Sequence, residues 1–301
     1  MKITHGLGAL AALVLVTGCG DGELILEGKR LPLRSDLNAP ADATEESADP
    51  LAPKAVTAAP ISLPAAQSNG EWTHRAGNAS HTAGHVALGA APARIWSVNI
   101  GQGDDRKHRI SADPIIAAGR VFTLDSRSTV TATGTNGERL WQVDLTPSAD
   151  KSDDASGGGL AYGEGRVYVT TGFGELVALD PQTGAVAWRQ RFDAAVGGAP
   201  AVADGRVYVV ARDASAWAVS ASTGKVEWVL PGTPSVSGVM GVSAPAVDAR
   251  QVVFPFASGQ MVAVAKDSGV GLWGAYVAGQ RLGRSYASVT DLTGDPVIAG
   301  G

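Results

Sequence analysis

Residues 199–228 read APAVADGRVYVVARDASAWAVSASTGKVEW, and this stretch decides the fold. It starts with small apolar residues, turns at Asp204-Gly205, and continues into three runs rich in Val, Tyr, Trp and Ala. Asp-Gly favours a tight hairpin turn, because glycine accepts the positive φ that such turns need. Thr223-Gly224 places another turn before the run that ends at Trp228. The stretch therefore predicts four short β-strands joined by turns.

The same pattern recurs on both sides of this stretch. The preceding unit has Gly165-Arg166-Val167-Tyr168 and the first has Gly119-Arg120-Val121-Phe122, where the quoted unit has Gly205-Arg206-Val207-Tyr208. A repeat of about 45 residues with four strands predicts an all-β protein, a β-propeller with four-stranded blades. Gly or Pro interrupts the chain too often for a helical repeat. The recurring tryptophans are spaced by 45, 47, 40 and 45 residues: Trp96, Trp141, Trp188, Trp228 and Trp273.

Four complete repeats occupy residues 111–294, and residues 295–301 align with Asp113 to Gly119 as the start of a fifth. Residues 70–110 form a lead-in that contains one predicted strand, Arg94–Ile100, with no strands of its own before it. We expect this strand to be the outer strand of a last blade outside the sequence. A fifth repeat that stops inside its first hairpin leaves an inner strand without a neighbour. The chain is therefore expected to form an open arc of about four blades, truncated from a larger ring.

The N-terminus has the features of a lipoprotein signal. Lys2 precedes an apolar run over residues 7–16, which is too short to span a bilayer, and the run leads to Cys19. We predict a signal peptide over residues 1–18 and acylation of Cys19, the single cysteine of the chain. Residues 19–69 follow as the lipidated cysteine and a disordered tether. The tether is rich in proline, alanine and acidic residues, and it cannot bury enough apolar surface to fold. Gly20, rather than Asp, favours the outer membrane over the inner one.

The charge of the chain argues against nucleic acid as a partner. The net charge is −5, and no long basic run is present. Affinity for nucleic acids depends on neutralising phosphates with Lys and Arg. We expect no nucleic-acid binding.

Residues 178–188, ALDPQTGAVAW, resemble the tryptophan-docking repeat of the PQQ-type (quinoprotein-like) propeller family. In that family the tryptophan packs between neighbouring blades and the Thr-Gly turn supports it. The resemblance implies that the five recurring tryptophans dock blade on blade. Residues 72–78, WTHRAGN, look like the lead-in of such propellers.

With the lipoprotein signal and the tether, the repeats are similar to the BamB family of outer-membrane assembly lipoproteins. That resemblance implies an eight-bladed ring, lipid-anchored at the periplasmic face of the outer membrane. It also implies a non-enzymatic scaffold that binds BamA of the β-barrel assembly machinery and supports folding and insertion of outer-membrane proteins.

The alternative is a periplasmic PQQ-dependent dehydrogenase-like or small-ligand-binding propeller. For an enzyme, the resemblance would imply a PQQ site, Ca²⁺, a catalytic carboxylate and usually a vicinal disulfide. The single cysteine of this chain cannot form that disulfide. Acids such as Asp180 and Asp204 fall at turns, where Asp bonds to nearby backbone. We expect no catalytic residue, cofactor, metal or small-molecule substrate. His74, His81 and His85 are expected in a solvated polar loop.

The predicted partner-binding site combines two inter-blade connections. One is the Gly-rich, uncharged loop after the Trp228 strand, and the other contains Asp291. The resemblance places contact loops of the family at these positions, although its arginine is absent here and Thr293 replaces one of its acids. Met240 suits a partner contact, because the flexible methionine side chain adapts to irregular surfaces. We expect one shared face, centred on Val239, Met240 and Asp291, from the set Val236, Ser237, Gly238, Val239, Met240, Gly241, Val242 and Asp291.

Overall fold

A computed structural model describes residues 61–235, 243–278 and 290–300. The predicted signal peptide, Cys19, most of the predicted tether and the loop 236–242 lie outside the described residues. The chain divides into two compact units, residues 1–61 and 62–301, and the fold is that of the second unit.

The described residues form four sheets of four antiparallel strands each, paired in chain order. The prediction of an all-β protein with four-stranded blades is confirmed. The strands are β1 (Ile115–Ala117), β2 (Arg120–Leu124), β3 (Thr129–Gly134), β4 (Arg139–Asp144), β5 (Gly158–Gly163), β6 (Arg166–Thr171), β7 (Glu175–Leu179), β8 (Val186–Arg191), β9 (Ala201–Ala203), β10 (Arg206–Val210), β11 (Ser215–Ser220), β12 (Val226–Pro231), β13 (Ala246–Val247), β14 (Gln251–Pro255), β15 (Gln260–Ala265) and β16 (Gly271–Tyr276).

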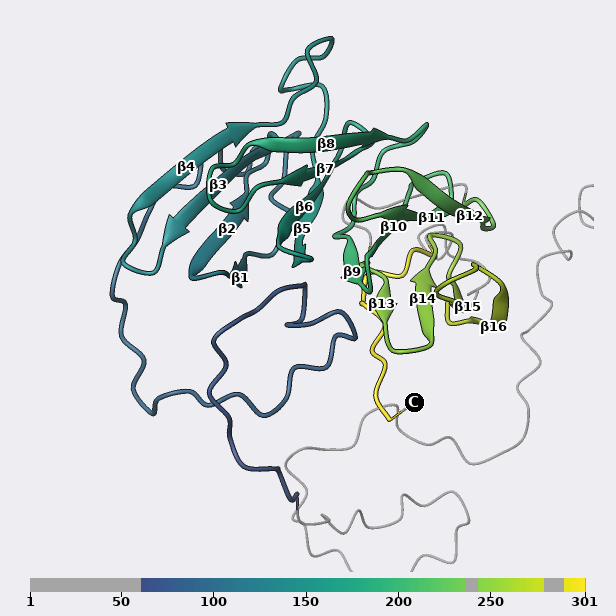
Figure 1. Cartoon of the computed structure of the whole chain (residues 1–301), viewed down its shortest axis with the longest axis horizontal. Helices are drawn as coiled ribbons and strands as arrows, with labels where there is room; N and C mark the ends of the chain where they lie inside the picture. The colour runs from purple at the N-terminus through teal and green to yellow at the C-terminus, as the bar shows by residue number, and fades with distance from the viewer. Residues whose placement is uncertain (1–60, 236–242, 279–289, 301) are drawn as a thin grey trace, which may run out of the picture. The chain divides into compact units, whose positions relative to one another are not determined.

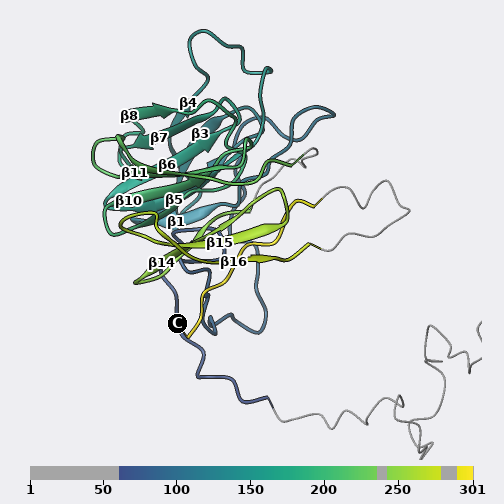
Figure 2. The ribbon, with the colours of Figure 1, turned by 90° about the vertical axis from the view of Figure 1, so that its right-hand side faces the viewer.

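The four sheets follow one another in an open arc, as expected (Figures 1 and 2). The first strand of each blade, β1, β5, β9 or β13, lies on the concave side, and the last, β4, β8, β12 or β16, lies on the outside (Figure 1). Three of the inner strands have only two or three residues and are made of Ile, Val and Ala. Small side chains suit this position, because the blades converge there.

Tight turns join the first two strands of the first three blades. The turn residues Glu164 and Gly165 have φ of 50° and 72°, and Asp204 and Gly205 have φ of 49° and 76°. Two successive positive φ values define the two-residue hairpin turn that matches the twist of β-strands. The hairpin predicted from Asp204-Gly205 is therefore confirmed.

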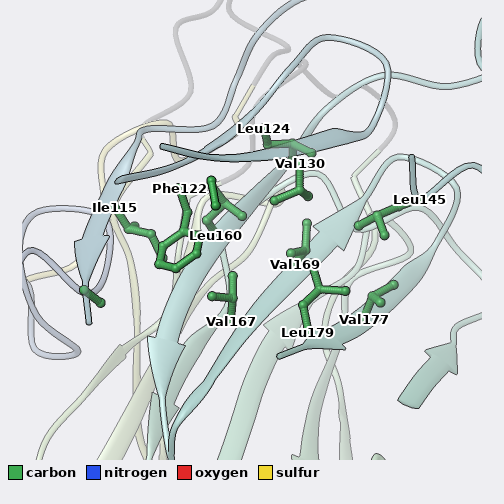
Figure 3. Close-up of a cluster of buried hydrophobic side chains, with 12 residues drawn as sticks. Ile115, Phe122, Leu124, Val130, Leu145, Leu160, Val167, Val169, Val177 and Leu179 are labelled. Atoms are coloured by element: carbon green, nitrogen blue, oxygen red, sulfur yellow. The ribbon is translucent and has the colours of Figure 1, made fainter. Parts of the chain in front are cut away.

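The hydrophobic core lies between blades rather than within one of them. In the first cluster, Phe122 and Val130 of the first blade pack against Leu160 and Val169 of the second (Figure 3). Similar clusters join the second blade to the third and the third to the fourth. Each blade thus buries its faces against its neighbours, as radial repeats do.

Residues 94–100 are the exception to the predicted strands. No strand is assigned there, although the alternating exposure from Ile95 to Ile100 matches that of β4. A strand needs a neighbour to share ladder hydrogen bonds. Within the described residues no segment pairs with this one, so it remains extended chain without a ladder.

Candidate functional site

Each inter-blade junction is built from one tryptophan and one glycine turn. A Cβ atom added to Gly224 would lie 2.7 Å from the Trp188 ring, and one added to Gly184 would lie 2.7 Å from the Trp141 ring. The same holds for Gly137 under Trp96 at 2.8 Å. These glycines have φ of 74° to 83°, so the turn needs glycine both for its backbone and for the space.

The indole N–H groups add a second contact to the junctions. Trp96 Nε1 donates to the Thr135 carbonyl at 2.8 Å, and Trp188 Nε1 donates to the Ala221 carbonyl at 3.1 Å. Trp188 is also tilted against Tyr168 of its own blade, with ring centroids 5.8 Å apart. Trp188 therefore links the core of its blade to the turn of the next one, and Trp96 binds the turn of the first blade from the lead-in.

The last two tryptophans depart from this pattern. Trp228 packs on Gly269, but its Nε1 has no hydrogen-bond partner in the described part of the chain. Trp273 is 45% exposed, and its Nε1 donates to Gln251 Oε1 of its own blade at 3.1 Å. Within the described residues Trp273 therefore lies against its own blade and not on a glycine turn.

Of the predicted partner-binding residues, the structure describes Asp291 alone, together with the residues that flank the loop. Val236 to Val242 are outside the described residues, whereas Asp291 is half-buried. Ser243, at the end of the loop, donates its hydroxyl to the carbonyls of Leu292 and Gly294. The Ala244 N–H donates to Asp295 Oδ1 at 2.8 Å. The structure thus joins the end of the loop to the segment that carries Asp291.

Two exposed residues at this place were missed by sequence reasoning. Tyr276 is 72% exposed and Val277 is 57% exposed, at the end of β16. The Val277 N–H donates to the Gly259 carbonyl, and the hydroxyl of Thr290, the neighbour of Asp291, donates to the Ala257 carbonyl. Val277 and Thr290 therefore both bond to the turn between β14 and β15. We call Tyr276, Val277, Thr290 and Asp291, together with the buried Ser243, the loop face. The available sequence signal was the short apolar run Ala275-Tyr276-Val277 after Trp273.

A strap over residues 101–111 crosses the same end of the first two blades. Both ring nitrogens of His108 face acceptors: Nδ1 lies 2.9 Å from Asp105 Oδ2 and Nε2 lies 3.0 Å from the Asp153 carbonyl oxygen. The Asp153 carbonyl and the Asp105 carboxylate raise the pKa of His108, and His108 in turn lowers the pKa of Asp105. A cavity of about 350 Å³ opens beside it, lined among others by Lys107 and Arg212.

The histidines of the lead-in correct an expectation. His74 and His81 are 4% and 5% exposed, so the prediction of a solvated polar loop is wrong for both. His74 Nε2 accepts the Val202 N–H at 2.9 Å, and His81 Nδ1 donates to the Pro296 carbonyl at 2.7 Å. His85 is exposed, as expected. Contacts more than a hundred residues away bury the first two rings, which local composition cannot reveal.

The described ranges contain neither a metal-binding cluster nor a membrane-spanning helix. No three His, Cys, Asp or Glu side chains among them converge as a metal ion would require. None of them forms a helix of the length and apolarity that a bilayer crossing needs.

Comparison with known proteins gives two kinds of similarity. The family model described as outer membrane protein assembly factor BamB matches residues 126–301. Among curated proteins, quinohemoprotein alcohol dehydrogenase of Comamonas testosteroni is 33% identical over 102 residues, covering 32% of this chain and 14% of the dehydrogenase. An uncharacterised protein of Rickettsia prowazekii is 30% identical over 79 residues, covering 26% of this chain and 19% of that protein.

Solved structures show the same two groups. BamB from Moraxella catarrhalis superposes with a TM-score of 0.54 at 20% identity, over 66% of this chain and 59% of that one. The quinohemoprotein alcohol dehydrogenase of Comamonas testosteroni gives 0.55 at 20% identity, over 68% and 41%. At this identity the likeness shows the propeller fold alone. The chain spans less than two thirds of the length of every relative named.

Proposed function

The chain belongs to the family of the outer membrane protein assembly factor BamB, and from that membership we propose that it is a non-enzymatic scaffold of the β-barrel assembly machinery. In this role it binds the periplasmic part of BamA and supports the folding and insertion of outer-membrane proteins. The observation that carries the proposal is the family match over residues 126–301, more than half of the chain. The signal ending at Cys19 supports a location at the periplasmic face of the outer membrane.

The loop face supplies the chemistry that a protein partner requires. It combines an exposed tyrosine and valine with one carboxylate, Asp291, at one end of the fourth blade. Tyrosine is enriched at interfaces, because it buries apolar area and still makes hydrogen bonds. Loops on rigid scaffolds commonly carry recognition. We therefore assign the BamA contact to the loop face together with Val236 to Val242, centred on Val239, Met240 and Asp291.

Capture of BamA from solubilised membranes tests this assignment. We expect Met240→Glu and Asp291→Arg each to lower capture at least about tenfold, since a few central residues dominate such interfaces. Val270→Glu is the matched control, because Val270 is 62% exposed at the opposite end of the β15–β16 hairpin. Wild-type capture by both site variants, with normal circular dichroism, would place the contact elsewhere. Equal loss in the control would show a non-specific effect of charge.

The anchor makes a separate prediction. Cys19→Ser is expected to move the protein from the membrane pellet to the soluble fraction, because two or three acyl chains give stable anchoring and an unacylated chain has none. Fractionation with a β-barrel membrane protein as the pellet marker measures this. A Cys19→Ser protein that still pellets after a high-salt wash would contradict lipidation at this residue.

The similarity to a dehydrogenase supports PQQ binding as a second candidate function. The quinohemoprotein alcohol dehydrogenase is 33% identical over part of the chain, so PQQ binding is the competing hypothesis. The two functions differ in what they bind, and a direct binding measurement separates them.

A further inference from the structure

The lead-in segment, residues 72–82, contacts the inner strand of every described blade in turn. Trp72 exchanges two backbone hydrogen bonds with Ile116 of β1, and the Thr73 carbonyl accepts the Tyr162 N–H of β5. The chain then reaches the third and fourth blades: the His74 ring accepts the Val202 N–H, and the Ala79 carbonyl accepts the Val247 N–H. Ser80 accepts from Ile298 in the segment after the fourth blade. Residues 72–82, called the central clasp below, thus cross the concave side of the arc (Figure 1).

Arg75 adds a charged contact at the centre of the clasp. Its Nε lies 3.1 Å from Asp113 Oδ2 and 3.0 Å from Asp295 Oδ2. These aspartates precede prolines at aligned positions before the first blade and after the fourth. Asp295 is largely buried, and Asp113 is more than half exposed. One guanidinium therefore holds both ends of the described arc.

The two buried histidines give the clasp its sensitivity to protons. His74 Nε2 accepts a hydrogen bond, so this nitrogen carries no proton, and Nδ1–H faces Thr73 Oγ1 at 2.8 Å. Protonation would turn Nε2 into a donor that faces the Val202 N–H. His81 uses Nδ1 on Pro296, and its Nε2 is buried with no partner among the described residues. A proton there would place a buried charge that lacks a hydrogen bond.

We propose that the central clasp is a pH-sensitive device, which holds the inner strands together at neutral pH and releases them on acidification. Its geometry requires both imidazoles to be neutral. The charged and titratable groups that face them are His74 and His81 toward each other, Arg75, and Asp295 beside His81. Asp295 and Asp113 are both held by Arg75, and two carboxylates cannot offset two imidazolium charges and a guanidinium. The device uses none of the residues assigned to the BamA contact, and its test measures hydrogen exchange rather than binding.

The titration has a definite direction. Burial, followed by the neighbouring His81, lowers the pKa of His74 from 6.5 to about 4, and burial also lowers the pKa of His81. A histidine whose pKa falls on folding stabilises the folded state fully above pH 6.5. That contribution is lost as the pH falls from 6.5 toward 4. For His74 alone, the protection of the clasp at pH 5 is expected to be about 30-fold below that at pH 7.5.

Hydrogen exchange of the full chain, read by mass spectrometry and corrected for intrinsic rates, measures this protection. Peptides over residues 72–82 should lose about 30-fold between pH 7.5 and 5, and peptides over β6–β7 far less. In His74→Gln/His81→Gln the loss should disappear, because glutamine can donate and accept without titrating. His85→Gln changes the exposed histidine that follows the clasp and should keep the wild-type response.

Three outcomes would overturn the device. They are a wild-type clasp with unchanged protection, equal loss in β6–β7, and an unaltered pH response in the double glutamine variant. If the double variant does not fold, the histidine resonances of the wild-type protein decide by NMR. A buried imidazole titrating near pH 4 supports the device, and two imidazoles titrating near 6.5 overturn it.

Discussion

Replacing Trp188 with alanine is expected to lower the free energy of unfolding by about 3–5 kcal/mol. The ring packs on the Gly224 turn of the next blade and on Tyr168 of its own blade, and it donates to the Ala221 carbonyl. Truncation removes all three contacts and leaves a gap between two blades that cannot close, because both are rigid sheets. Urea denaturation followed by tyrosine and tryptophan fluorescence measures the loss.

Trp273→Ala is the matched control for this experiment. Trp273 is 45% exposed and contacts Gln251 of its own blade. The same substitution should therefore cost below about 1.5 kcal/mol, since exposed positions contribute little. Equal losses for the two variants would contradict a special role of the inter-blade contact.

Gly224→Ala is expected to cost about 2–4 kcal/mol, and Gly205→Ala about 1–2. The two glycines have φ of 74° and 76°, so a Cβ strains both backbones alike. They differ in surroundings, because a Cβ on Gly224 meets the Trp188 ring at 2.7 Å and one on Gly205 meets nothing within 4 Å. The excess at Gly224 thus isolates the steric contact with tryptophan.

A double-mutant cycle tests that reading. In a Trp188→Ala background the excess cost of Gly224→Ala over Gly205→Ala should vanish, because the ring that it meets is gone. An excess of unchanged size would mean that Gly224 is needed for the turn alone.

The local elements of the fold could be predicted because their signals are local. Asp204-Gly205 adopts the predicted turn, and the regular spacing of the tryptophans places four-stranded blades where they are found. The segment 94–100 shows the limit, since its alternating pattern suits a strand but pairing depends on a neighbour.

The chemistry of the clasp and of the loop face could not be predicted in the same way. The buried rings of His74 and His81 bond to the backbone of Val202 and Pro296, which are 128 and 215 residues away in sequence. Local composition around both histidines is polar, so it indicates a solvated loop. Tyr276 and Val277 are exposed at the end of β16, and nothing in one repeat shows which strand end is left uncovered.

Titration of the purified full-length protein with the purified periplasmic part of BamA from the same organism tests the assembly function most directly. A parallel isothermal titration calorimetry experiment with PQQ and Ca²⁺ tests the competing hypothesis of a ligand-binding propeller. The scaffold function predicts a saturable complex with BamA, weakened by Met240→Glu and kept by Val270→Glu, and no heat from PQQ. Saturable uptake of PQQ with no complex with BamA would contradict it and establish a ligand-binding propeller instead.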